Sequence, residues 1–357
     1  MRKLLSILFL VSILFSLGTS QEKGRLSGLA YFDYSYNVAR DTAIGGFSNT
    51  ALSGAKSFQA FQFRRIYFTY DYDITSDFTS RFRLEADETE RTSNGKTGVF
   101  VKDAFLKWKN AFGQNDLIFG VQPTPAYEIS ESVWGYRSLE KTIMDLRGIV
   151  SSRDLGVSLK GKLDGEGMFS YWVMVADGSA NKPETDKYKR YFLHIRLQPV
   201  KSLDITLYGD LDARATISNP YTTKRVSNST TTMAMFVGYV PMDGLKVGVE
   251  GVLTQTANGF NTGTALNTKS GLALSFFGSY GLRTDLTIVG RYDLYDPNTD
   301  GSAKTDSRDY FIAALDWKVN DRVSVIPNVQ IETYEESPSR TFDASVNGRL
   351  TVIWIFQ

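Results

Sequence analysis

The chain ends in Thr351-Val352-Ile353-Trp354-Ile355-Phe356-Gln357, a segment rich in aromatic and β-branched residues. These residue types favour a β-strand, although Gln357 departs from the aromatic residue that usually ends a barrel protein. Between this segment and the N-terminus runs a long series of short alternating segments. Together they predict a β-barrel of a bacterial cell outer membrane, where closure of the sheet satisfies every backbone polar group that faces lipid.

The N-terminus has the layout of a secretory signal peptide. Arg2 and Lys3 supply positive charge, an apolar run covers residues 4–17, and small residues precede a plausible cleavage point after Ser20. The apolar run is shorter than the ~20 residues that a membrane-spanning helix needs. We therefore predict a signal peptide over residues 1–20 and an outer-membrane barrel domain over residues 21–357.

The composition excludes several classes of function. The 357 residues include 40 basic and 39 acidic side chains, so the chain is close to neutral and has no electrostatic footprint for nucleic acid. There is no cysteine and one histidine, which excludes disulfides, thiolate metal sites and clusters of histidine ligands. We expect no cofactor and no bound metal. The mean hydropathy of −0.21 agrees with a barrel, because only alternate residues meet lipid.

Many segments alternate between apolar and polar residues with the period of a β-strand. In residues 203–211 the leucine and isoleucine side chains fall on one face and Asp204, Thr206, Tyr208 and Asp210 on the other. The same alternation recurs in residues 78–87, 155–163 and 323–332. A soluble β-sandwich also alternates, so this pattern alone does not place the chain in a membrane.

The lengths of the links between segments distinguish these two architectures. Short links with turn residues recur at 74–77, 164–167, 199–202, 241–244, 282–285 and 319–322. Longer polar links lie between them, at 39–56, 91–98, 178–187, 215–229, 257–268, 296–306 and 335–342. Strict alternation of short and long links is typical of a membrane barrel with periplasmic turns at one rim and external loops at the other.

The predicted fold is an all-β, closed antiparallel transmembrane barrel of about sixteen strands, an even number as in other bacterial single-chain barrels. We expect the strands at 25–38, 57–73, 78–90, 99–110, 116–122, 153–163, 168–177, 188–198, 203–214, 230–240, 245–255, 269–281, 286–295, 307–318, 323–334 and 343–357. Two of them are ambiguous. Residues 99–110 mix charged and apolar side chains on one face, and residues 349–357 are apolar on both faces.

Residues 58–180 resemble the phosphate-selective porin O and P family. The resemblance rests on short pieces in a matching order: residues 63–68 (FRRIYF), 82–87 (FRLEAD), 102–108 (KDAFLKW), 118–123 (IFGVQP), 153–157 (RDLGV) and 175–178 (VADG). It implies a sixteen-stranded outer-membrane barrel, assembled as a homotrimer, that passes small hydrophilic solutes or ions passively. It does not establish phosphate as the solute.

The link over residues 123–152 is far longer than a connection between adjacent strands needs, and long loops of this kind are usually functional. It is the third external loop, which folds into the lumen of sixteen-stranded general porins and narrows the pore. We expect the same here, with a short helical turn over residues 138–146. The candidate constriction charges are Arg137, Lys141, Arg147, Glu131 and Asp145.

Candidate pore-wall residues come from the second and third strands. Arg64, Arg81 and Arg83, together with Arg65, fall on polar faces of neighbouring strands and could form a basic stripe. Across the whole barrel, however, the acidic and basic lumen positions balance, which predicts weak overall selectivity. We therefore favour the alternative that these arginines form cross-strand salt bridges with Glu85 and Asp87.

A diffusion channel is the function that this pattern favours, and it requires no chemical step. One alternative is an adhesin or structural barrel with a plugged lumen. Another is an outer-membrane lipid hydrolase, which would need a serine paired with the single histidine, His194. A lone histidine in a strand is more often structural, so we expect no enzyme. The expected partners are small solutes or ions, outer-membrane lipid and further copies of the chain.

Overall fold

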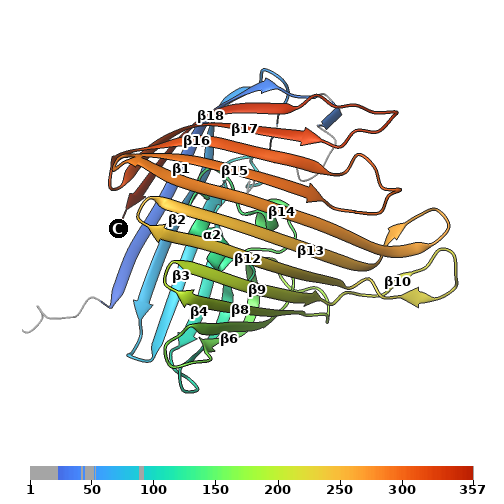
Figure 1. Ribbon diagram of the computed structural model, residues 1–357. Coiled ribbons are helices and arrows are strands. Elements are labelled where there is room, and N and C mark those ends of the chain that lie inside the picture. The colour runs from blue at the N-terminus through green and yellow to red at the C-terminus, as the bar shows by residue number, and fades with distance from the viewer. Residues whose placement is uncertain (1–22, 42, 45–51, 53, 88–91, 357) are drawn as a thin grey trace, which may run out of the picture.

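The computed structural model describes residues 23–41, 43–44, 52, 54–87 and 92–356. In this part of the chain, sixteen antiparallel strands close into one barrel, in the order β1-β18-β17-β16-β15-β14-β13-β12-β9-β8-β7-β6-β5-β4-β3-β2 (Figure 1). This confirms the predicted fold. The predicted signal peptide lies outside the described residues.

The barrel strands agree closely with the predicted segments. Their bounds are β1 Gly24–Ala39, β2 Gln59–Asp73, β3 Phe78–Asp87, β4 Phe100–Trp108, β5 Asn115–Pro123, β6 Arg153–Lys162, β7 Phe169–Ala176, β8 Arg190–Val200, β9 Leu203–Asp212, β12 Thr230–Met242, β13 Leu245–Asn261, β14 Leu266–Arg283, β15 Leu286–Asp296, β16 Arg308–Asn320, β17 Val323–Tyr334 and β18 Ser345–Phe356.

The first and last strands close the barrel. In the antiparallel pair of β1 and β18, Gly28 lies opposite Phe356 and Ala30 opposite Trp354. The ring of Trp354 stacks on Phe32 at 4.9 Å between centroids. The beginning of β1 and the end of β18 therefore lie at the same rim, as expected for a barrel with both ends in the periplasm.

Alternation along each strand separates an apolar outer face from a polar inner face. On β9, Leu207 and Leu211 are exposed on the outside, whereas Thr206 and Asp210 are buried on the inside. The same arrangement repeats around the barrel, so large apolar side chains cover its outer surface. A surface of this kind is stable in the hydrocarbon of a bilayer, which places the chain in the outer membrane as an integral barrel.

Two external links differ from the prediction. Strands β13 and β14 continue through the expected loop at 257–268 and leave only residues 262–265 as the turn. The link between β9 and β12 contains a small hairpin, β10 Ile217–Ser218 with β11 Arg225–Val226. Both segments are rich in Thr, Asn and Ser and bury neither face, so the apolar alternation that reveals a strand is missing.

The long loop after β5 folds inward and carries two short helices, α2 Glu128–Trp134 and α3 Ile143–Leu146. The predicted helical turn at 138–146 corresponds in part to α3, but α2 was not predicted. Helix α2 ends at Gly135, whose φ of 68° is left-handed and therefore suits glycine. No helix of the described residues is long and apolar enough to span a membrane.

Candidate pore constriction

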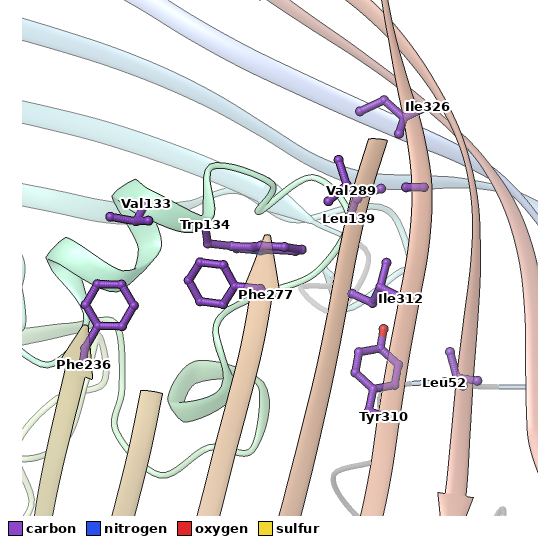
Figure 2. Packing of buried hydrophobic residues seen from close by; sticks show 11 residues of the cluster. Leu52, Val133, Trp134, Leu139, Phe236, Phe277, Val289, Tyr310, Ile312 and Ile326 are labelled. Atoms are coloured by element: carbon purple, nitrogen blue, oxygen red, sulfur yellow. The ribbon is translucent and has the colours of Figure 1, made fainter. Parts of the chain in front are cut away.

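Apolar packing fixes the inward loop to one side of the lumen. Val133, Trp134 and Leu139 of the loop pack against a patch on the inner faces of five strands (Figure 2). The strand residues of this cluster are Phe236, Phe277, Val289, Tyr310, Ile312, Ala314 and Ile326. The Trp134 ring meets Phe277 edge-on at 5.2 Å, and its indole N–H donates to the Glu140 carbonyl oxygen at 2.8 Å.

A second apolar cluster fixes the following part of the loop. Tyr127, Ile143 and Met144 are buried with residues of β7, β8, β9, β13 and β14. Those strand residues are Met174, Ala176, Phe192, Tyr208, Val252 and Ala273. The loop therefore covers the inner wall from β7 to β17 and leaves the remaining wall, β18 and β1 to β6, facing its charged side.

Polar contacts add to this attachment. The Arg147 guanidinium donates to Glu332 on β17 at 2.7 Å, and neither side chain is exposed to solvent. The Ser130 hydroxyl donates to Glu250 on β13 at 3.0 Å. The predicted constriction residue Arg147 is thus enclosed between loop and wall, with the rings of Tyr295 and Tyr310 beside it.

The other four predicted loop charges lie together. Arg137 donates to Glu131 and to Asp145, each at 2.7 Å, and Lys141 lies 4.0 Å from Asp145. Burial opposes ionisation of Asp145, but Arg137 and Lys141 outweigh it and hold the pKa of that carboxyl below its ordinary value. Asp145 therefore stays ionised beside its two cations near neutral pH.

Two β-bulges add charged residues to the facing wall. In β2, Arg65 pairs with Tyr31 and Phe63 with Phe32, so Arg64 is an extra residue. In β4, Asp103 pairs with Arg83 and Val101 with Leu84, so Lys102 is an extra residue. A bulge lets two successive side chains turn toward the same face. The second bulge also explains why residues 99–110 show mixed faces in the sequence.

On this wall, basic side chains form salt bridges with buried carboxylates and lie between them and the lumen. Arg64 bonds Asp33 at 3.1 Å, and Arg65 and Lys102 bracket Glu85 at 2.8 and 3.0 Å. Arg83 at 3.4 Å and Arg153 bracket Asp103. We call these eight residues the basic wall. Its five cationic side chains are 9–22% exposed, whereas its three carboxylate side chains are 0–1% exposed.

The basic wall and the loop meet at Arg64, which donates to the carbonyl oxygens of Ser138 and Leu139 at 3.0 and 3.1 Å. Arg81 lies apart from this contact. It pairs with Asp71 at 2.7 Å and lines a polar cavity of about 650 Å³ with Arg25 and Lys107, nearer the periplasmic turns. The structure therefore brings Arg64 and Arg83 to the constriction level and leaves Arg81 at the inner mouth.

Cross-strand salt bridges are present, as the favoured interpretation held, but Arg64, Arg81 and Arg83 form them with Asp33, Asp71 and Asp103. Arg65 is the residue that pairs with Glu85 and, at 3.6 Å, with Asp87. Sequence reasoning also missed Lys102 and Arg153 as partners of the wall carboxylates. Lys102 is hidden by a bulge, which strict alternation cannot show, and Arg153 begins a strand directly after the long loop.

The single histidine is buried on β8, opposite Trp172 of β7 and Tyr208 of β9. Within the described residues, no hydrogen bond joins its ring to a serine. In the same part of the chain, no group of three or more His, Asp or Glu side chains is arranged to hold a metal ion.

A closed barrel of sixteen strands, with an apolar outer face and a loop folded into a charged lumen, defines an outer-membrane β-barrel of the porin fold. The outer-membrane channel DcaP of Acinetobacter baumannii is similar, with a TM-score of 0.66 and 11% identity over 93% of this chain and 97% of that chain.

Two further solved structures share the fold. The anion-selective porin from Comamonas acidovorans has a TM-score of 0.63 and 11% identity, over 93% of this chain and 99% of that chain. The outer-membrane protein OmpT of Vibrio cholerae has a TM-score of 0.61 and 13% identity, over 94% of this chain and 99% of that chain. No protein-family model and no curated protein sequence matches the chain.

Proposed function

We propose that this protein is a porin: a water-filled channel of the outer membrane through which small hydrophilic solutes and ions diffuse passively. The observation that carries the proposal is the arrangement of the long loop. It is attached to one half of the inner wall by two apolar clusters and leaves its charged residues opposite the basic wall. Charged groups facing each other across a narrow passage bias ion traffic without any chemical step.

We further propose that the channel prefers small anions, phosphate among them. The cluster on the loop consists of two cations and two carboxylates, Arg137, Lys141, Glu131 and Asp145, so this cluster contributes little net charge. The basic wall differs, because its cations lie over its carboxylates and are the more exposed groups. A mobile anion therefore meets guanidinium and ammonium groups first. The resemblance of residues 58–180 to phosphate-selective porins and the fold shared with an anion-selective porin agree with this preference.

Single-channel recording in planar bilayers tests the channel itself. The purified protein should produce discrete conductance steps in potassium chloride. Small glycans or polyethylene glycols that enter the pore should lower this conductance, and larger ones that no longer enter the pore should leave it unchanged. Absence of conductance steps from protein that is folded and inserted would contradict the proposal. In that case a plugged barrel would be the better account.

We also propose that the protein assembles as a homotrimer. An apolar groove of about 1110 Å³ crosses the outer surface from β13 to β18 and β1. Its floor consists of Gly278, Gly290, Ala313 and Gly348, of which the first three lie opposite one another on β14, β15 and β16. Beside the groove, Phe61 on the outer face of β2 is 89% exposed. The projecting side chain of Phe61 next to this groove suits a contact between two different faces of neighbouring subunits. Contacts of this kind can close into a cyclic oligomer.

A further inference from the structure

An outer arm projects from the external rim of the barrel. Strand β14 pairs with β15 only as far as Leu272, and β13 pairs with β12 only as far as Thr256, so the β13–β14 hairpin continues alone beyond both neighbours. The β10–β11 hairpin lies against it (Figure 1). We define the outer arm as residues 213–229 and 257–271.

Side-chain contacts join the two hairpins into one unit. The Tyr221 hydroxyl bonds the Asn261 side chain. The Asn258 amide donates to the Ser227 carbonyl oxygen at 3.0 Å, and the Ala257 N–H donates to the Ser229 carbonyl oxygen at 3.0 Å. These bonds hold the two segments together at the external rim.

The outer arm carries positive charge only. Its charged residues are Arg214, Lys224, Arg225 and Lys269, and neither of its segments contains an aspartate or glutamate. Arg214 is paired with Asp212 at the barrel rim. Among the described residues, no carboxylate lies within salt-bridge distance of the other three cations. By contrast, the external link after β7 contains both signs, and its Lys189 pairs with Asp177 and Glu184 at 3.3 and 3.0 Å.

The composition of the arm disfavours a lipid surface as the partner. The outer apolar face of the barrel still includes Leu253 on β13, which is exposed and lies opposite Leu272 on β14. Lys269 follows three residues beyond Leu272, and the arm around it consists mainly of threonine, serine and asparagine side chains. Binding in a lipid interface requires apolar area beside the basic groups, and this polar surface offers little of it.

We propose that the outer arm binds an acidic polysaccharide. Lys224, Arg225 and Lys269, which have no salt bridge, match sugar carboxylates, sulfates or phosphates, although Arg225 also bonds Thr216 within the arm. The many threonine, serine and asparagine side chains around them match sugar hydroxyls. The arm exposes few apolar groups, which disfavours a protein partner with a hydrophobic contact. This binding activity is independent of the proposed channel and would give the barrel a second function in adhesion.

Binding of the full-length barrel in detergent to heparin tests the proposal, with neutral dextran as the comparison. We expect binding to heparin and none to dextran. The triple variant K224Q/R225Q/K269Q should lose about tenfold in affinity, because each exposed charge pair contributes modestly. The matched control K182Q/K187Q, in the external link after β7, should bind as the wild type does. All variants should keep the wild-type channel conductance.

Three results would overturn the proposal. The first is wild-type protein that does not bind heparin at physiological ionic strength. The second is equal loss of binding in the triple variant and in the control. The third is stronger binding to vesicles that contain anionic phospholipid than to heparin, which would assign the arm to the membrane. Loss of conductance with binding intact would count against the proposed channel only.

Discussion

Arg147 shows how one buried charge holds the constriction together. Its guanidinium lies between the loop and β17, bonded to Glu332 and flanked by two tyrosine rings. In a pore, a cation of this kind adds nothing to the charge that a passing ion meets. Its role is to hold the loop against the wall, whereas Arg137 and Lys141 belong to the surface of the loop that faces the basic wall.

We predict that R147A destabilises the attachment of the loop. Removing one partner of a buried pair costs about 3–5 kcal/mol when the other charge is left alone. Glu332 keeps the Tyr334 hydroxyl at 3.2 Å and the positive charge of Arg308 nearby, so we expect a smaller loss here. Limited proteolysis within residues 123–152 measures the effect. Equal protection of R147A and wild type would show that the pair does not hold the loop.

At the scale of the elements, the loop is held mainly by packing. Trp134 joins the end of α2 to strands β12 and β14, and Arg291 of β15 lies over its ring at 5.2 Å. The helices themselves are too short to be stable alone. Their position is therefore a consequence of the apolar patch on the inner wall, which explains why sequence periodicity did not reveal α2.

We predict that W134A frees the loop and changes conduction. Truncating a buried tryptophan costs about 3–5 kcal/mol through lost burial and a new cavity. Single-channel traces should therefore become noisy, with several conductance levels in place of one. W108A is the matched control, because Trp108 lies on the outer face of β4. Steady traces from W134A would contradict the role assigned to this packing.

At the scale of the whole molecule, the sequence predicted the barrel better than its interior. Alternation and link lengths located the barrel strands, because one face of each strand meets lipid. They could not locate the bulges at Arg64 and Lys102, which break that alternation, or the register that brings Arg153 beside Asp103. The outer arm was also missed, since strands exposed on both faces carry no apolar signal.

The oligomeric state is a second property of the whole protein. We predict that G290W fills the floor of the outer groove and yields monomers, while L207W, on the outer face of β9 away from the groove, assembles as the wild type does. Native mass measurement in detergent distinguishes the two. Trimers of G290W as stable as those of the wild type would place the contact elsewhere on the barrel.

The basic wall should make the pore prefer anions, and the reversal potential in a potassium chloride gradient measures this preference. The variant R83Q/K102Q leaves each wall carboxylate with one cation, Arg65 on Glu85 and Arg153 on Asp103. Arg283, at a periplasmic turn, gives the control R283Q. We predict that the reversal potential of the wild type lies nearer the equilibrium potential of chloride than that of potassium. It should be unchanged in R283Q and should shift toward the equilibrium potential of potassium in R83Q/K102Q. A potassium-selective wild type, or a double variant identical to it, would show that the basic wall does not set the selectivity of the pore.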